Sequence, residues 1–243
     1  MRIALFSDIH SNYHALEAVL SDIALRGVDR ILCLGDITLK GPLPKECVDR
    51  VRDLGCPVVL GNADGCYHPD FHPERFPAQN ESQVAVHADF ARHLGALTQA
   101  DQAWLQGFPL HLTETWEGTS VEFFHATPGH NYVLTMPWAA NEHLAALRTA
   151  ETTRLSAFGH CHRAFVRVLH GFTVMNTGSV GLPFDGDPRP SYALVDVDQG
   201  HLTSTTIVRV SYDAEAAIKA ARAVNMAGWE LFAHTARTGQ FPG

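Results

Sequence analysis

The stretch "RIALFSDIHSN", residues 2–12, decides the fold class, because an apolar run of strand length stops abruptly at polar residues. Ile3–Phe6 is typical of a strand buried on both faces, and Asp8 and His10 follow it directly. The next apolar residues have the i, i+3, i+4, i+7 spacing of an amphipathic helix: Leu16, Val19, Leu20, Ile23 and Ala24. A second apolar run at Ile31–Leu34 completes a strand–helix–strand unit, which predicts a parallel pair and an α/β fold.

The same pattern recurs along the chain, where short apolar runs end in Gly, Asp, Asn or His. The expected strands are Ile3–Phe6, Ile31–Leu34, Val58–Leu60, Val121–Phe124 and Ala157–Phe158. Ligands bind beyond the carboxyl ends of parallel strands, where neighbouring loops converge. The polar residues expected to meet there are Asp8, His10, Asp36, Asn62, His125, His160 and His162.

The remaining segments complete the expected organisation. Further helices are expected at Pro42–Leu54 and Glu81–Leu97, with a proline-rich loop at Pro69–Pro77. Beyond His162, turns at short intervals predict antiparallel strands at Phe165–Leu169, Phe172–Met175, Tyr192–Val197 and Leu202–Val210. We expect one domain over residues 1–243, with a C-terminal helix at about residues 213–223 and a frayed tail at residues 239–243.

Composition narrows the classes of function. The formal net charge is -8, and the eighteen Lys and Arg are spread along the chain, so nucleic acid is an unlikely partner. The N-terminal apolar run is too short for a signal or membrane segment, and we expect no membrane association and a cytoplasmic protein. Five cysteines without paired spacing suit reduced thiols. The oligomeric state stays open, a homo-oligomer included.

Each polar motif alone has an ordinary structural explanation. Asp8 or Ser11 can be a helix N-cap, Asp36 and Asn62 can belong to turns, and a histidine can lie at the rim of a core. Five strands that all end in such residues favour a metal site instead. Carboxylate, amide and imidazole ligands without thiolate suit manganese, iron or zinc. Seven ligands are too many for one ion, and two ions about 3.5 to 4 Å apart can share one bridging carboxylate.

The ordered motifs DxH, GD, GNxD, H and GHxH, over about residues 1–197, resemble the calcineurin-like metallophosphoesterase superfamily. The opening "DIHSN" and the segment "NTGSVG" at Asn176–Gly181 are most similar to its small bacterial and archaeal phosphodiesterase-like branch. The resemblance implies an α/β four-layer sandwich, in which two mixed β-sheets are flanked by helices, with the site at one edge.

The resemblance also implies a role for each ligand. One ion would be bound by Asp8, His10 and His162, the other by Asn62, His125 and His160, with Asp36 as the bridge. The implied reaction is hydrolysis of a phosphate ester by a hydroxide that bridges the two ions at Asp36, with Asn62 donating its amide hydrogen to a phosphate oxygen. The expected substrate is a small phosphorylated molecule.

The chain departs from the family pattern at Ala63, where many members have a histidine that protonates the leaving group. Asp64, whose counterpart orients that histidine, is expected to have lost this role. A general acid contributes about 10² to 10⁴ in rate. Several phosphodiesterase-like relatives also lack it, so we expect a phosphodiesterase, with a nucleotide diester as one candidate substrate. The alternatives are a phosphomonoesterase or protein phosphatase, a nuclease, and a catalytically silent metal-binding scaffold.

Several further residues are candidates for contacts with substrate. Asn12 and Arg189 are candidate substrate-binding residues, and the leaving-group proton could come from Cys66, His68, His130 or Asn12. Tyr132 and Trp138 could frame a pocket for a base or sugar, or pack in the core beneath a long loop. His160 and His162 alternate around Cys161, which predicts an extended segment with both rings on one side and the thiol turned away.

Overall fold

A computed structural model describes residues 1–68, 71 and 77–241 of the chain. Its first sheet has four strands in the order β2-β1-β8-β9. These strands are β1 (Arg2–Phe6), β2 (Arg30–Cys33), β8 (Ser191–Asp198) and β9 (His201–Arg209). Strands β1 and β2 are parallel, with Leu5 opposite Leu32, whereas β8 runs antiparallel to both β1 and β9. This sheet is therefore mixed, and its parallel pair is the one expected from the opening sequence.

The second sheet has five strands in the order β3-β4-β5-β7-β6. They are β3 (His111–Trp116), β4 (Thr119–Phe124), β5 (Thr153–Phe158), β6 (Phe165–Leu169) and β7 (Phe172–Asn176). Strands β4, β5 and β7 are parallel, and β3 and β6 pair antiparallel at the two edges. Apolar side chains from both sheets, among them Leu5, Val195, Phe123 and Ala157, form one cluster, so the sheets pack face to face.

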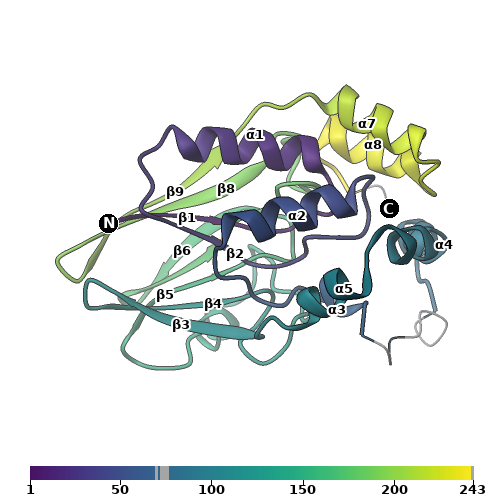
Figure 1. Ribbon diagram of the computed structural model, residues 1–243. Helices are drawn as coiled ribbons and strands as arrows, with labels where there is room; N and C mark the ends of the chain where they lie inside the picture. The colour runs from purple at the N-terminus through teal and green to yellow at the C-terminus, as the bar shows by residue number, and fades with distance from the viewer. Residues whose placement is uncertain (69–70, 72–76, 242–243) are drawn as a thin grey trace.

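Helices cover the outer faces of the two sheets. Their bounds are α1 (Tyr13–Ala24), α2 (Pro44–Leu54), α3 (Asn62–Gly65), α4 (Glu81–Ala96), α5 (Gln99–Gln106), α6 (Asn141–Ala145), α7 (Ala214–Ala223) and α8 (Trp229–Thr238). Helices α1 and α2 bury Leu16 and Val48 against the first sheet and lie along it in Figure 1. Leu144 of α6 packs against Phe124 and Phe158 of the second sheet. The expected architecture of two mixed sheets flanked by helices is confirmed.

Some elements differ from the expectation. The run Val58–Leu60 forms only one bridge, between Val58 and Cys33, because the chain turns into α3 immediately afterwards. Strand β7 is parallel to β5, although β6–β7 and β8–β9 are antiparallel as expected. The segment around Cys161 is a turn and not extended backbone, since His160 and His162 have φ values of 67° and 56°. Five elements had no expectation: α3, β3, α5, α6 and α8.

The C-terminal helix, the C-terminal tail and the proline-rich loop agree with the expectation to different degrees. Helix α7 lies where the C-terminal helix was expected. The start of the expected frayed tail is held in place, because the Gly239 carbonyl accepts from Gly186 N–H and the Phe241 ring packs edge-on against Phe184. The expected proline-rich loop at Pro69–Pro77 lies, apart from Phe71 and Pro77, outside the described residues. Within the described part of the chain, no helix combines the length and apolar character that a membrane span requires.

Candidate metal centre

The seven candidate ligands come together at the edge where parallel strands of both sheets end. Asp8 and His10 follow β1, Asp36 follows β2, His125 follows β4, and the remaining two histidines follow β5. The loops after β1 and β2 are joined by backbone hydrogen bonds, such as Asp8 N–H to the Gly35 carbonyl at 3.0 Å and His10 N–H to the Asp36 carbonyl at 3.0 Å. Side chains from distant segments are thereby fixed in one place.

The backbone at the site is held in a conformation that non-glycine residues rarely adopt. Five candidate ligands have left-handed φ values between 47° and 67°: Asp8, His10, Asp36, His160 and His162. Such a conformation costs roughly 1–2 kcal/mol for a residue with a side chain, so it persists only where the surrounding structure enforces it. Strain concentrated on one cluster of polar side chains is typical of a functional site.

One group of ligand atoms consists of Asp8, His10 and His162, all fully or almost fully buried. Asp8 Oδ1 lies 3.3 Å from His162 Nε2 and 3.9 Å from His10 Nε2. The two imidazole Nε2 atoms are 3.1 Å apart, and the rings stack with centroids 4.8 Å apart. Phe184 stacks on the other face of His162 at 4.3 Å, which fixes the orientation of that ring.

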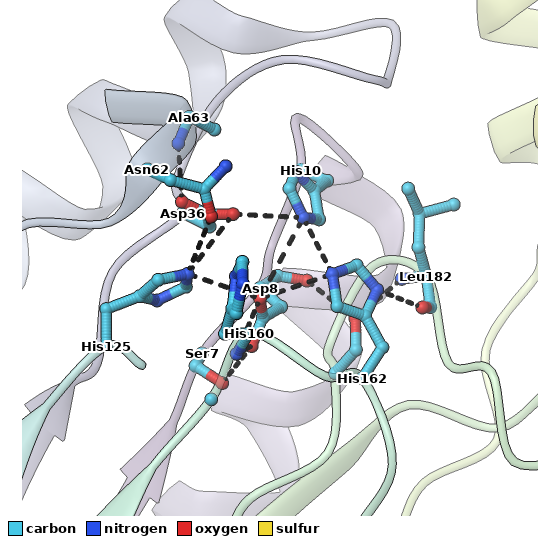
Figure 2. Close-up of polar contacts among 12 residues, drawn as sticks. Ser7, Asp8, His10, Asp36, Asn62, Ala63, His125, His160, His162 and Leu182 are labelled. Carbon is cyan, nitrogen blue, oxygen red and sulfur yellow. Dashed lines mark hydrogen bonds and ion pairs between the residues drawn. The ribbon is translucent and has the colours of Figure 1, made fainter. Parts of the chain in front are cut away.

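A second group consists of Asp8, Asp36 and His125, so that Asp8 belongs to both groups. Asp36 Oδ2 lies 3.4 Å from His125 Nε2 and 3.4 Å from His10 Nε2, which places this oxygen between the two halves of the site. Figure 2 shows His125 and His162 on opposite sides of the two carboxylates. The geometry therefore brings together the residues that the sequence singled out, with Asp36 in a central position.

Asn62 and His160 join the second group. Asn62 Oδ1 lies 3.1 Å from His125 Nε2 and 2.8 Å from His160 Nδ1, so this oxygen faces only acceptors. His160 N–H donates to Asp8 Oδ2 at 3.0 Å. His160 lies beside His125 and His162 lies beside His10, and a turn and not a strand separates them. Their division between two ions stays a prediction.

The hydrogen bonds of three histidines determine which ring nitrogen faces the carboxylates. Nδ1 contacts a backbone carbonyl in each ring: His10 with Thr38 at 3.1 Å, His125 with Leu34 at 2.8 Å and His162 with Leu182 at 2.5 Å. A carbonyl only accepts, so Nδ1 carries the hydrogen, and a neutral ring then presents the Nε2 lone pair to the site. Imidazole nitrogens that converge on carboxylate oxygens fit a bound cation once each Nε2 is unprotonated, and such Nδ1 hydrogen bonds are typical of metal-binding histidines.

The pKa values of the buried groups reflect the negative charge of the two carboxylates at the site. Burial alone would raise the pKa of Asp8, but the adjacent His162 lowers it to about 2. Burial would likewise lower the pKa of His125, but the carboxylates of Asp36 and Asp8 raise it to about 9. Burial, followed by the charge of His125, lowers the pKa of His160 to about 4. A protonated His125 therefore partly compensates two buried carboxylates that have no lysine or arginine ion pair among the described residues.

Residues that sequence reasoning passed over support the ligands. The Ser7 hydroxyl donates to Asp8 Oδ2 at 2.5 Å, and the Ser179 hydroxyl donates to the Asp8 carbonyl at 2.8 Å. Gly181 N–H also donates to the Asp8 carbonyl. The "NTGSVG" segment thus uses its polar groups to hold the β1 loop in place. Its polar residues beside glycines were the available signal in the sequence.

The sequence suggested that Asp64 has lost the role of orienting a histidine at position 63, and the structure gives it a different role. Its buried carboxylate accepts from Ile37 N–H at 3.0 Å and from Thr38 N–H at 3.3 Å, in the loop that follows Asp36. Burial, and next the charge of Asp36, raise the pKa of Asp64 to about 7. Asp64 therefore orders the backbone beside the central carboxylate without any histidine at position 63.

The two candidate substrate contacts already have partners within the protein. The fully buried Asn12 side chain caps α1 by accepting from Ala15 N–H and donates to the Gly181 carbonyl at 3.0 Å. The exposed Arg189 guanidinium forms an ion pair with Asp187 at 2.6 Å. Neither makes a contact with the candidate ligands among the described residues, so a role in substrate binding stays a prediction.

The candidate proton donors and ring residues lie in different surroundings. Cys66 Sγ donates to the Asn62 carbonyl at 3.3 Å, and burial raises the pKa of its thiol to about 12. His130 is exposed, with its ring 5.5 Å from that of Tyr132. Tyr132 lines a cavity beside the site, whereas Trp138 does not and instead lies beneath the Arg163 guanidinium. Both aromatic rings are exposed, so packing in the core is excluded for them.

Buried carboxylates and imidazoles at the strand ends of two facing sheets define an α/β protein with a candidate metal centre at the edge of a β-sandwich. Residues 1–200 match the model of the calcineurin-like phosphoesterase superfamily domain. The chain belongs to this superfamily. Membership supports a hydrolase, and it implies divalent metal ions for which the structure provides candidate ligand groups.

Relatives agree with this assignment. An uncharacterised protein of Methanocaldococcus jannaschii is 32% identical over an alignment that is 242 positions long. The alignment covers 88% of this chain and 89% of the relative. The crystal structure of a metallophosphoesterase from Sphaerobacter thermophilus is 29% identical, with a TM-score of 0.75 over 98% of this chain and 100% of the other. A hypothetical protein of Pyrococcus horikoshii is 16% identical, with a TM-score of 0.84 and 98% of each chain covered, and it shows the fold alone.

Proposed function

We propose that the protein is a dinuclear metal-dependent phosphodiesterase. The observation that carries the proposal is the convergence of three Nδ1-anchored imidazoles on two buried carboxylates that form no ion pair with lysine or arginine among the described residues. Asp8, His10 and His162 would hold one ion, Asn62, His125 and His160 would hold the other, and Asp36 would be shared between them. Manganese, iron and zinc all suit this set of oxygen and nitrogen donors.

The protein's own residues would orient the phosphate ester and retain its charge. Bound metal ions polarise phosphoryl oxygens and lower the pKa of water, and that is the chemistry which they would supply here. The Asn62 amide lies beside His125 and His160, where it could donate to a phosphoryl oxygen in the transition state. The carbonyl contacts of His10, His125 and His162 keep the ring orientations fixed while the charge changes.

The preference for diesters rests on Ala63. This methyl group is 1% exposed, and Ala63 N–H donates to Asp36 Oδ1 at 2.7 Å, so position 63 adjoins the centre but offers no titratable group. Without a general acid at this place, no side chain protonates the leaving oxygen, so hydrolysis favours esters with good leaving groups. We expect the rate of monoester hydrolysis to be reduced most. The substrate class that follows is a small phosphodiester, and nucleotide diesters are included in it.

The test is a rate comparison on protein with a defined manganese content. We expect bis(4-nitrophenyl) phosphate to be hydrolysed faster than 4-nitrophenyl phosphate. Ala63→His should increase the rate on a monoester with a poor leaving group, such as phenyl phosphate, because that leaving oxygen needs a proton. Asp36→Asn should abolish both activities and reduce the bound manganese. Faster hydrolysis of the monoester by the unmodified protein would overturn the diester preference. A protein that binds no manganese and hydrolyses neither ester would favour a scaffold on the same fold.

Three further properties remain proposals. We propose that residues 1–243 form one domain, because α7 contacts α1 and packs against α8. We propose a cytoplasmic location, which free thiols at Cys33, Cys47, Cys56, Cys66 and Cys161 support. A small phosphorylated molecule is the proposed partner, with no role for a membrane or a nucleic acid.

A further inference from the structure

A cavity of about 570 Å³ adjoins the candidate metal centre. Its wall includes Asn62 and Ala63, so it begins where the metal-binding residues end. The volume lies within the range of about 300–1,000 Å³ that is usual for sites that bind small molecules. An ester whose phosphate lay at the centre could therefore place its organic group in this cavity.

The chemistry of the wall favours a flat, partly apolar group. Apolar and aromatic side chains from four separate segments line it: Leu39, Val86, Phe90, Tyr132 and Phe241. Aromatic rings bind other rings through stacked or edge-on contacts. The Tyr132 ring is 65% exposed, so its face is open to a ligand. Gln79, Asn80 and Gln83 contribute amides, whose NH₂ groups can donate to the edge of a heterocyclic ring, while the oxygens of Asn80 and Gln83 already accept from backbone N–H groups.

Lys40 supplies a cation at the side of the cavity near the metal centre. Its side chain lines the cavity together with Asn62, and no described residue forms an ion pair or hydrogen bond with its ammonium group. The loop that carries Lys40 lies against the site, because the Thr38 carbonyl contacts His10 Nδ1 at 3.1 Å.

The loop that carries Lys40 is fixed on both sides. Leu39 and Lys40 have left-handed φ values of 62° and 60°. Asp64 accepts from the backbone just before them, at Thr38, and Arg92 donates to the Gly41 carbonyl just after them at 2.9 Å. The backbone at Lys40 is therefore already fixed, so only the side chain loses freedom when it binds an anion.

We propose that this cavity binds an aromatic ring on the organic group of the phosphate ester, as in a nucleotide, and that Lys40 binds its phosphate. This inference rests on the proposed function and adds the class of organic group and a specificity-determining residue. Lys40 would supply positive charge beside Ala63, where the protein has no imidazole. No covalent step is assigned to it.

Equilibrium dialysis of the full chain loaded with manganese tests the inference. The probes are adenosine 5′-monophosphate and ribose 5-phosphate. Release of inorganic phosphate is measured in the same samples. We expect the adenosine compound to bind at least about tenfold more tightly, because only it carries a ring. Lys40→Met should weaken the binding of both probes by about tenfold or more, and Lys40→Arg should retain most of it.

Two variants of α4 distinguish the effect of filling the cavity from a general effect of a new tryptophan on the helix. Gln83→Trp fills part of the cavity and should remove the advantage of the adenosine compound, without any change for ribose 5-phosphate. Val84→Trp is the matched control, because Val84 is 58% exposed and does not line the cavity, and it should change neither affinity.

The outcomes distinguish this inference from the proposed function. Equal affinity for the two probes, or an unchanged advantage in Gln83→Trp, would overturn the ring-binding role while hydrolysis of diesters continues. Unchanged binding of both probes by Lys40→Met would overturn the role of the lysine. If the manganese-loaded protein hydrolyses no phosphate ester and binds neither probe, the proposed function fails first, and this inference fails with it.

Discussion

Metal binding at neutral pH should release a proton from His125. Its pKa of about 9 arises because Asp36 and Asp8 outweigh the effect of burial. At about pH 7.5 the ring is therefore protonated in a ratio of about 30 to 1 in the metal-free protein. A histidine binds metal only through an unprotonated nitrogen, so its proton must leave. His10 and His160, whose pKa values are lowered, are already neutral and contribute none.

The assay is calorimetric titration of chelator-treated protein with manganese at about pH 7.5 in two buffers with different ionisation enthalpies. We expect the difference in heat to correspond to about one proton for each protein molecule, and the apparent affinity to rise about tenfold for each pH unit up to about pH 9. In His125→Gln the buffer dependence should disappear. Heats for the unmodified protein that do not depend on the buffer would refute the reasoning.

The same pKa predicts how the stability of the metal-free protein depends on pH. The folded-state pKa of His125 lies above the unfolded value of 6.5, so its contribution is fully present below about pH 6.5 and is lost as the pH rises through about 9. The difference amounts to about 3 kcal/mol for this fully buried ring. Urea unfolding with chelator at both ends of this range, compared with His125→Gln, measures it. An equal pH dependence in the two proteins would contradict the assignment.

Four substitutions test the geometry of the site. His160→Ala and His162→Ala should each lose about one different bound ion by elemental analysis and metal titration, and identical losses in both would argue against the division of ligands. Gly159→Ala should destabilise the protein by about 1–3 kcal/mol in urea unfolding, because a methyl group there would overlap the Asp8 carboxylate, and a wild-type midpoint would refute this. Asp64→Ala should cost about 1–3 kcal/mol by removing a buried acceptor from two backbone N–H groups, and an unchanged midpoint would show that water replaces it.

The elements that sequence patterns predicted well are those whose apolar periodicity is strong. The run Ile3–Phe6 and the helical stripe that follows it became β1 and α1, with the expected parallel partner. The run Val58–Leu60 is also apolar but pairs through one residue, because the chain turns into α3 immediately afterwards. Strand β3 has mostly polar residues at its exposed positions, so its sequence does not indicate a strand. Its pairing with β4 makes it one.

The cluster of candidate ligands could be expected from the sequence because metal chemistry restricts which residue types can bind an ion at strand ends, and metal binding itself stays a prediction. The conformation of the GHCH segment was not, since left-handed φ values at His160 and His162 have no signature in residue type. Supporting contacts such as the Ser7 hydroxyl on Asp8 and the Phe184 ring on His162 also depend on tertiary packing alone. A single sequence shows which atoms can bind metal, but the structure is needed to show what holds them.

The hydrogen bond between His160 N–H and the Asp8 carboxylate joins residues 152 positions apart in the chain. A contact of such sequence separation forms only after the intervening strands have found their partners. During synthesis, the first half of the chain carries Asp8, His10 and Asp36 for some time without the histidines that complete the proposed centre. Capture of metal would thus come late in biogenesis, and occupancy of the centre would report that both sheets have assembled.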